Sequence, residues 1–349
     1  MALKDTDIYE LIQGFHTTQA IYAAVRLHLP EALADGSQKL ETLARTTSCD
    51  SALLKRLLRF LVAMDIVTEP EADTFVLASK GEALLPNSPQ SLASFAIRSG
   101  EELYQGWSKL YEGLVTNTAP FELHFGQSYF EYLHDHPRTA ELFQHTMQEH
   151  TQRCISAALE AYDFAQHHSL LDVGGGLGQV ASAIVEHYPG VKGTVLELPE
   201  VIAQTDKTAP STIQFQIGDF FEHIPMGYDL LILKCIIHDW PDAAARVILK
   251  NCRQAMTVDD TMLLIESPIS EHTEKAASYR NDLQMFTLFH AKERTLAEYQ
   301  QLLTDADLRL VKHIPLSHPG LANLSILVVK LLERCVLENG GRLVSHSCR

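Results

Sequence analysis

The second half of the chain alternates short apolar runs with amphipathic stretches, and this alternation restricts the fold more than any other feature. From residue 169 to about 330, helical patterns such as QVASAIVEHY and AAARVILKNCRQAM separate apolar runs such as SLLDV, VKGTVLEL, YDLLILKCII and TMLLIESPI. Short, continuous apolar strands separated by helices are typical of a parallel sheet that is covered on both faces. The sequence therefore predicts an α/β domain here.

Polar residues follow one of these apolar runs directly. In LILKCIIHDWPD (231–242), Lys234, His238 and Asp239 come at the far end of a strand that otherwise reads as core. Ligands of parallel α/β sheets bind at the carboxyl ends of the strands. We therefore expect these side chains to lie where a ligand binds, although Asp239 or Asp242 is also well placed to cap the next helix.

A glycine-rich turn joins the first predicted strand of this domain to its first helix, in LLDVGGGLGQVASAIV. Glycines let the backbone turn sharply and approach a ligand closely. A dinucleotide is one candidate ligand, but a G-x-G-x-x-G frame starting at Gly174 meets Gln179, and a frame of Gly176, Gly178 and Ala181 fits loosely. A nicotinamide-dependent oxidoreductase is therefore a weak alternative.

Acidic residues end three successive predicted strands. Asp172 precedes the glycines, Glu197 ends VKGTVLEL, and Asp219 follows IQFQIG. Carboxylates accept hydrogen bonds from ribose hydroxyls and an adenine amino group, and the neighbouring Phe220 could pack on the adenine ring. A pyrophosphate would be repelled by this much negative charge. The pattern favours a cationic nucleoside without phosphates, S-adenosylmethionine.

The first hundred residues read as helices followed by a hairpin. Residues 8–35 and two segments of LETLARTTSCDSALLKRLLRFLVAMDIV have helical apolar spacing, and VTEPEADTFVLA reads as two strands around an acidic turn. This is a winged-helix arrangement, so a DNA-binding regulator is a non-enzymatic alternative. The presumed recognition helix carries Lys55, Arg56 and Arg59, but its leucine-rich sides suit packing against another subunit better than a major groove.

The overall composition argues against several other classes of protein. The net charge is −16, from 28 basic and 44 acidic residues, which opposes nucleic-acid binding. No apolar run approaches the roughly 20 residues of a membrane span, and MALKDTDIYE has no signal-peptide pattern, so we expect a cytoplasmic protein without a membrane partner. The six cysteines form no C-x-x-C pair and lie at no zinc-ligand spacing to histidines, so no metal is expected.

Six short motifs carry a resemblance to a known family. DVGGGLG, LELPEVI, GDFF, LKCIIHDWPD, LLIESPI and AKERT, in this order, resemble the caffeic acid/acetylserotonin-type S-adenosylmethionine-dependent O-methyltransferases, whose bacterial members include phenazine and polyketide methyltransferases. The resemblance extends from the N-terminus to about Lys330. It implies a winged-helix dimerisation domain (1–100), a Rossmann-like class I methyltransferase domain with a helical lid or connector (101–332), and a tail (333–349).

The resemblance also implies which residues bind the cofactor. The family's contacts fall on Gly174, Glu197, Asp219, Phe220 and Lys234. The family usually has Asp where this chain has Glu197. Glutamate is one methylene longer and offers the same acceptor oxygens, so we expect the ribose contact to be kept.

By the same resemblance, the catalytic base falls on His238 and two flanking acids on Glu266 and Glu293. A phenol has a pKa near 10 and an ordinary histidine near 6.5, so a neutral imidazole can accept the phenolic proton as the oxygen attacks. A carboxylate on the other ring nitrogen would fix the tautomer and stabilise the imidazolium. These residues predict proton removal without a metal.

The walls of the substrate pocket are predicted from apolar residues at helical spacing. Met147, Met285 and Phe289 are candidate pocket walls, although Met and Phe at helical spacing are more often core. In the mainly helical stretch 90–165, the aromatic residues of FELHFGQSYFEYL suit either a core or a lid over an aromatic ligand.

The sequence as a whole predicts a homodimeric O-methyltransferase that acts on a hydroxyl of an aromatic or polyketide-like small molecule and releases S-adenosylhomocysteine. An alternative keeps the fold but uses the bound sulfonium only as a fixed charge, for hydroxylation or pericyclic chemistry. Intact His238, Glu266 and Glu293 favour methyl transfer.

Overall fold

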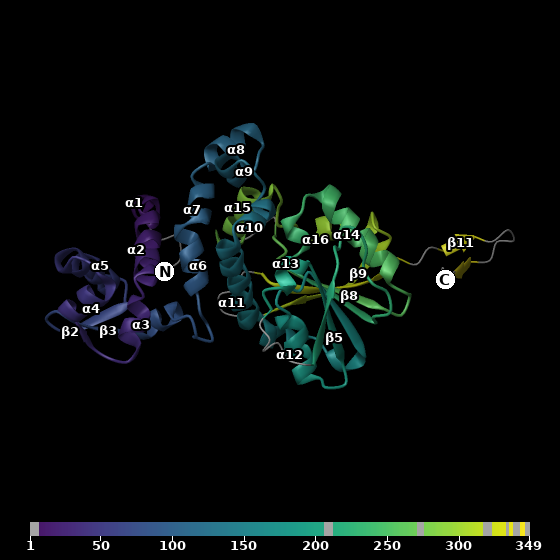
Figure 1. The fold of residues 1–349 in the computed structure, drawn as a ribbon. Coiled ribbons are helices and arrows are strands. Elements are labelled where there is room, and N and C mark those ends of the chain that lie inside the picture. Colours follow the sequence, from purple (N-terminus) through teal and green to yellow (C-terminus); the bar gives the residue numbers. More distant parts are fainter. Residues whose placement is uncertain are drawn as a thin grey trace. The chain divides into compact units, whose positions relative to one another are not determined.

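The computed structural model describes residues 7–205, 212–270, 276–316 and 323–332, together with the backbone of two short strands at 335–337 and 343–345. The chain divides into two compact units. The first contains Met1–Tyr111 and Leu123–His150, and the second contains Glu112–Glu122 and Thr151–Arg349 (Figure 1). Each unit has its own hydrophobic core.

The N-terminal part of the first unit has the predicted order of helices and hairpin. Its elements are α1 (Ile8–Ile12), α2 (Gly14–Arg26), α3 (Leu29–Ala34), β1 (Gln38–Lys39), α4 (Leu40–Thr47), α5 (Ser51–Ala63), β2 (Val67–Glu71) and β3 (Thr74–Leu77). The strands form a small antiparallel sheet in the order β1-β3-β2. The single helix predicted over 8–35 is broken before Pro30, which lacks an N–H and lies in the first turn of α3, where a proline is tolerated.

Further helices complete the first unit and lead into the second. They are a 3-10 segment (Ser79–Leu84), α6 (Ala93–Gly100), α7 (Glu102–Trp107), α8 (Leu110–Thr116), α9 (Pro120–Phe125), α10 (Tyr129–Asp135) and α11 (Pro137–Ala161). Buried polar contacts join α10 and α11 to α6: Arg98 donates to the Tyr129 hydroxyl at 2.5 Å, and Glu149 accepts from the Ser91 hydroxyl at 3.0 Å. These contacts associate residues 123–150 with the N-terminal helices.

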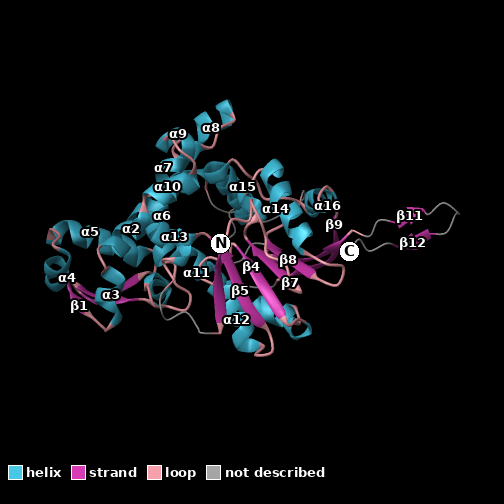
Figure 2. Ribbon diagram, turned by 45° about the vertical axis from the view of Figure 1, so that its right-hand side comes forward, coloured by secondary structure: helices cyan, strands magenta, loops and turns pink. Residues whose placement is uncertain are grey.

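A seven-stranded sheet forms the centre of the second unit, in the order β6-β5-β4-β7-β8-β10-β9 (Figure 2). Its strands are β4 (Ser169–Val173), β5 (Lys192–Glu197), β6 (Ile213–Ile217), β7 (Leu230–Lys234), β8 (Thr261–Glu266), β9 (Leu308–Pro315) and β10 (Ser325–Leu331). The five strands β4 to β8 are parallel, as predicted. At one side of the sheet the pairing is antiparallel, because β10 runs antiparallel to both β8 and β9, a direction that the sequence analysis did not specify.

Helices cover both faces of this sheet, and alternate strand residues build a core on each side. One core packs β-strand side chains against α14 (Asp242–Ala255) and α16 (Leu296–Thr304). The other packs the intervening side chains against α12 (Gln179–His187) and the C-terminal part of α11. The short α13 (Pro199–Ile202) and the longer α15 (Ala276–Phe289) complete the unit. The predicted α/β architecture with a mainly helical N-terminal unit is confirmed.

The predicted tail, 333–349, contains two short strands, β11 (Cys335–Leu337) and β12 (Leu343–Ser345), that pair antiparallel with each other. Among the helices that the structure describes, none combines the length and hydropathy of a membrane span.

Candidate active site

The predicted cofactor residues gather at one edge of the central sheet. Because β4, β5, β7 and β8 are parallel and in register, Gly174 after β4 and the last residues Glu197, Lys234 and Glu266 of the other three strands lie along the same edge. Asp219 follows β6, which pairs with β5 at the end of this row. The carboxyl ends of the parallel strands therefore hold a row of polar side chains where α/β sheets bind ligands.

In the glycine loop between β4 and α12, Gly174 and Gly178 lie too close to their neighbours for a side chain at either position. Gly174 has a φ of +67°, and a Cβ at this position would lie 2.7 Å from Ile236 Cδ1 and 3.2 Å from Phe220 Cε1. Gly178, the N-cap of α12, has a φ of +80°, and its Cβ would lie 2.7 Å from Ile213 Cδ1. The ring of Phe220 thus lies directly against the loop.

Glu197 reaches back to the glycine loop. Its Oε2 accepts a hydrogen bond from the Gly176 N–H at 3.0 Å, and its Oε1 accepts from the Leu198 N–H at 2.8 Å. Burial raises the pKa of this carboxyl, and the two N–H groups oppose that rise. Each carboxylate oxygen can accept a second hydrogen bond, so both oxygens remain able to accept from a ribose hydroxyl.

Asp219 and Lys234 are held differently. Asp219 Oδ1 accepts from the Phe221 N–H at 2.8 Å, which fixes the carboxylate beside Phe220. Burial alone would lower the pKa of Lys234, but the neighbouring groups of Cys235, Cys154 and Asp172 raise it. Lys234 is half-buried at the end of β7, and these neighbours favour its charged form.

Asp172, grouped with Glu197 and Asp219 by the sequence, lies under the loop. It is buried, and its Oδ2 lies 2.6 Å from the position that a Cβ on Gly175 would take. Burial raises its pKa to about 7, and Lys234 opposes the rise. Asp172 thus lies beneath the glycine loop, while Glu197 and Asp219 lie along the carboxyl ends of the strands.

His238 lies in a single 3-10 turn, Ile237–Asp239, that follows β7. The residue is only 8% exposed. Its Nδ1 lies 2.9 Å from Glu293 Oε1, which is hydrogen-bonding distance, and 3.5 Å from Glu266 Oε2. Its Nε2 lies 3.4 Å from Asp239 Oδ1. The structure therefore brings the three predicted catalytic residues together and adds a third carboxylate.

The two predicted acids make different contacts. Glu293 Oε1 faces the imidazole and also accepts from the Asn281 side-chain amide, while the Glu293 N–H donates to Asp282 Oδ1 at 2.9 Å. Glu266 Oε1 instead accepts from the Ile237 N–H at 2.9 Å. Glu293 thus orients the ring directly, and Glu266 holds the backbone of the turn beside it.

The acids around His238 determine its charge. Burial alone would lower the pKa of His238, but Glu293, Glu266 and Asp239 together raise it well above its ordinary value. Burial raises the pKa of Asp239 to about 7, and burial likewise raises the pKa of Glu266; in both cases His238 opposes the rise. The cluster therefore shares protons near neutral pH.

The same cluster has the composition of a metal-binding group. One ligand atom from each of His238, Glu266 and Glu293 can be chosen so that all three lie within 4.8 Å of one another. In this structure His238 Nδ1 and the Glu293 carboxylate form a hydrogen bond, which is the arrangement of a histidine oriented for acid–base catalysis.

The predicted substrate residues lie in different parts of the chain. Met285 is buried and Phe289 half-buried, both on α15 of the second unit, and Met147 is half-buried on α11 within the first unit. Of the aromatic residues read as core or lid, Phe121 and Tyr129 are fully buried and belong to the core.

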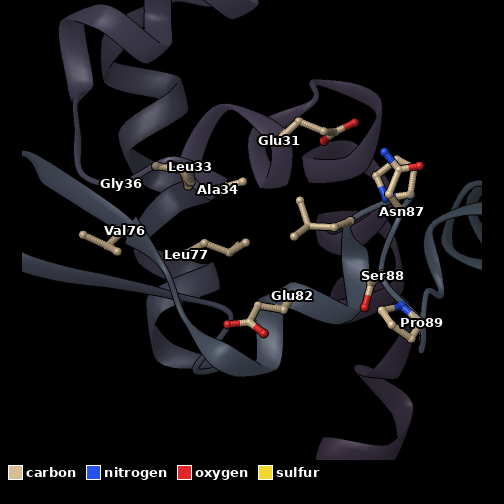
Figure 3. Close-up of a pocket in the computed structure, with 12 residues that line it drawn as sticks. Glu31, Leu33, Ala34, Gly36, Val76, Leu77, Glu82, Asn87, Ser88 and Pro89 are labelled. Atoms are coloured by element: carbon tan, nitrogen blue, oxygen red, sulfur yellow. The ribbon is translucent and has the colours of Figure 1, made fainter.

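A cavity of about 560 Å³ lies in the first unit (Figure 3). Its walls come from α3, β3 and the segment that follows β3, and Glu31 and Glu82 are the acidic residues among those that line it. The described lining includes none of the residues predicted for cofactor, base or substrate.

Sequence reasoning missed three functional neighbours of His238. Asp239 was read as a helix cap, but α14 begins at Asp242 without a side-chain cap, and Asp239 faces the imidazole instead. Asn281 and Arg294 were not singled out. Arg294 directly follows Glu293 in AKERT, which was the available signal, but an arginine beside a glutamate is usually an exposed residue.

Comparison with known proteins identifies the family of the chain. Residues 107–309 match the O-methyltransferase domain, and residues 9–89 match the O-methyltransferase dimerisation domain. The phenazine O-methyltransferase PhzM of Lysobacter antibioticus is 32% identical over 313 residues, which cover 88% of this chain and 92% of the relative.

Solved structures give the same result. The crystal structure of LaPhzM has a TM-score of 0.88 and 31% identity, covering 93% of this chain and 98% of that one. NcsB1 from neocarzinostatin biosynthesis was solved with S-adenosylmethionine and 2-hydroxy-5-methyl naphthoic acid; its TM-score is 0.77 at 27% identity, covering 90% of this chain and 96% of that one. The chain belongs to the S-adenosylmethionine-dependent O-methyltransferase family whose members carry an N-terminal dimerisation domain.

Proposed function

We propose that this protein transfers a methyl group from S-adenosylmethionine to a hydroxyl of an aromatic or polyketide-like small molecule, with His238 as the general base. The observation that carries the proposal is the geometry of the imidazole. Nδ1 is bonded to Glu293 at 2.9 Å, so the tautomer with the proton on Nδ1 leaves Nε2 to accept a proton. A neutral Nε2 next to a bound hydroxyl is what proton removal requires.

The chemistry follows from these roles. Bound S-adenosylmethionine supplies a methyl group that is already activated by a positive sulfur. The hydroxyl oxygen forms the new C–O bond as the C–S bond breaks, and His238 Nε2 takes the hydroxyl proton. Glu293 then stabilises the imidazolium through Nδ1, and Glu266 adds negative charge at 3.5 Å.

The cofactor residues have separate roles in this proposal. Glu197 accepts from the ribose hydroxyls, Asp219 accepts from the adenine amino group, and Phe220 packs on the adenine ring. Gly174 lets the chain pass close to the cofactor, where its φ of +67° requires glycine. Lys234 places a positive charge at the end of β7.

The acceptor class is inferred from relatives and from the apolar candidates for the pocket. PhzM is a phenazine O-methyltransferase, and NcsB1 was solved with a naphthoic acid. Met285 and Phe289 on α15 would supply apolar walls for a flat ring. The proposed chemistry needs no metal, since the sulfonium already activates the methyl group.

Calorimetric titration tests the cofactor assignment before any substrate is known. We expect S-adenosylmethionine and S-adenosylhomocysteine to bind, and NAD not to bind. Glu197→Ala should weaken both sulfur nucleosides by about 1–3 kcal/mol, since it removes hydrogen bonds to a charged group, whereas the exposed Glu186→Ala should not. Prior dialysis against EDTA should change nothing. NAD binding with no binding of either sulfur nucleoside would overturn the assignment.

Product mass tests the reaction itself. A panel of hydroxylated aromatic compounds should yield products that are heavier by one methylene group, with S-adenosylhomocysteine formed in equal amount. A product that gains oxygen or only rearranges, with the methyl donor unconsumed, would instead support the alternative in which the sulfonium acts only as a fixed charge.

A further inference from the structure

Among the described residues, Arg294 is the largest side chain that is fully buried. Its guanidinium donates hydrogen bonds to the turn that carries His238. Its exposure is 0%. Nη1 donates to the Ile237 carbonyl at 2.8 Å and Nη2 to the Trp240 carbonyl at 2.8 Å. Nε and Nη2 also donate to Asp242 Oδ1, at 3.0 and 2.8 Å. The guanidinium thus spans the turn from one side to the other.

The turn needs this support because its own hydrogen bonds are few and long. The Asp239 N–H reaches the Ile236 carbonyl at 3.2 Å, and the Trp240 N–H reaches the Ile237 carbonyl at 3.4 Å. A 3-10 turn has poorer hydrogen-bond geometry than an α-helix. The turn also starts from Cys235, whose φ of +54° is unfavourable for a residue with a side chain. Backbone of this kind persists only where its surroundings hold it.

Two side chains from other parts of the chain hold this turn in place. Ile237, the residue before His238, donates its N–H to Glu266 on β8 and gives its carbonyl to Arg294. Arg294 itself is fixed by its neighbours, since it lies over the Tyr299 ring at 6.0 Å and its backbone carbonyl accepts from the Ile269 N–H at 3.0 Å.

The same arginine is adjacent in sequence to Glu293, which orients the imidazole. Two adjacent residues therefore act on the same turn: Glu293 orients the imidazole, and Arg294 holds the backbone that carries it. The charge of Arg294 also lowers the pKa of Glu266, although burial raises that pKa overall. This favours the ionised acid next to His238.

We propose that Arg294 is the positioning residue of the catalytic turn: it holds His238 against Glu293 by bridging the Ile237 and Trp240 carbonyls, and it does not itself contact substrate or cofactor. This proposal rests on the role of His238 given above. Lysine cannot replace it, because one ammonium group cannot span both carbonyls and the Asp242 carboxylate in the planar geometry of a guanidinium.

The first test is the kinetics of Arg294→Lys, with Arg246→Lys as the matched control. Arg246 lies on α14, the helix that begins at Asp242. It forms an exposed ion pair with Asp305, in which Nε lies 2.9 Å from Oδ2. We expect Arg294→Lys to lower kcat by about 10²-fold, the effect of displacing a catalytic group by about 1 Å, and to leave S-adenosylhomocysteine affinity within about twofold. Arg246→Lys should leave kcat unchanged. Wild-type kcat in a folded Arg294→Lys protein would overturn the proposal.

The second test separates positioning from mere stability. In Arg294→Ala, added guanidinium at concentrations far below those that unfold the protein should restore part of kcat, and methylammonium should not, since only the planar ion can bridge the two carbonyls. If the variant loses S-adenosylhomocysteine binding and melting temperature together, and guanidinium restores nothing, Arg294 is only structural and the proposal fails.

The third test reports on the imidazole without using catalysis. The NMR titration of His238, identified by comparison with His238→Gln, should show a pKa well above the ordinary range in the wild type. In Arg294→Lys the ring should move away from Asp239, Glu266 and Glu293, and its pKa should fall. Lys234, Cys235, Asp282 and Tyr299, ionisable groups that also lie near this cluster, are not substituted. An unchanged titration would contradict the positioning role. Full turnover in His238→Ala would instead refute the general-base role alone.

Discussion

His238 is surrounded by more negative charge than a simple base requires. Three carboxylates, from Asp239, Glu266 and Glu293, lie within 3.5 Å of its ring nitrogens. They raise its pKa well above the ordinary value against the effect of burial. The imidazole therefore keeps its proton to a higher pH than an ordinary histidine does, and it must lose that proton before it can act as a base.

This charge state predicts the pH dependence of kcat/KM. Below its pKa His238 cannot accept a proton, and since that pKa is raised, kcat/KM should still be rising with pH above about 6.5, the ordinary histidine value. Glu293→Gln removes a charge that raises the pKa, so the rising limb should move to lower pH while kcat falls. Glu186→Gln, on the exposed side of α12, is the control and should leave the profile in place. A kcat/KM that reaches its plateau below pH 6.5 would contradict this account, as would a pH profile that Glu293→Gln does not shift.

The sequence could predict which acids approach His238 only where a motif marked them. Glu266 and Glu293 follow from LLIESPI and AKERT, and the structure places both at the imidazole. Asp239 could not be assigned, because whether it caps a helix or faces the ring depends on where α14 begins; α14 begins at Asp242, with Pro241 as its N-cap residue, so Asp239 lies before the cap. Arg294 could not be assigned either, because two of its three partners are backbone carbonyls, which leave no mark on a sequence, and the third, Asp242, is 52 residues away in the chain.

At the scale of single elements, the glycine loop is the segment with the least freedom to change. Gly178 combines a φ of +80° with neighbours on β5 and β6: an added Cβ would lie 2.7 Å from Ile213 Cδ1 and 3.0 Å from Phe215 Cζ. A side chain there would have to adopt a left-handed conformation and displace strand residues of the core at the same time. The loop, and with it the start of α12, depends on this glycine.

Gly178→Ala should therefore lower the free energy of unfolding by about 1–3 kcal/mol, from left-handed strain and overpacking, and should weaken S-adenosylhomocysteine binding. Gly190→Ala is the matched control, because a Cβ there has no neighbour within 4 Å and the φ is not positive; its change should stay below about 0.5 kcal/mol. Urea unfolding of both variants measures the difference. Equal stabilities would show that the loop tolerates a side chain.

Element prediction was good where strands are buried and poor at the sheet edge. All residues of β8 are buried, as are all but one of β7, so their apolar runs stand out. β9 was missed because it alternates exposed polar residues such as Arg309 and Lys312 with few buried ones. The direction of β10 was not predictable from its apolar run, since direction depends on the connection that precedes it and not on the side chains.

At the scale of the whole molecule, the first unit leaves apolar side chains uncovered. Ile8, Tyr9, Ile12 and Phe15 on α1 and α2 are between 47% and 68% exposed. A contiguous apolar group of this kind usually marks an interface, and these residues lie at or beside the start of the stretch that matches the dimerisation domain. We infer that a second copy of the chain covers them.

Light scattering after size exclusion tests this inference. The wild type should have the mass of a dimer, and the double variant Ile12→Glu/Phe15→Glu should shift toward the monomer, because each glutamate would bury a charge in an apolar contact. Met226→Glu, at an exposed position in the second unit, should remain dimeric. A monomeric wild type would contradict the inference that a second copy of the chain covers these residues.

The central claim is that His238 removes the proton during methyl transfer, and one comparison tests it most directly. With a hydroxylated aromatic acceptor that the wild type methylates, His238→Ala should lower kcat by about 10²–10⁴-fold and leave S-adenosylhomocysteine affinity unchanged. Turnover in His238→Ala equal to that of the wild type would contradict the claim.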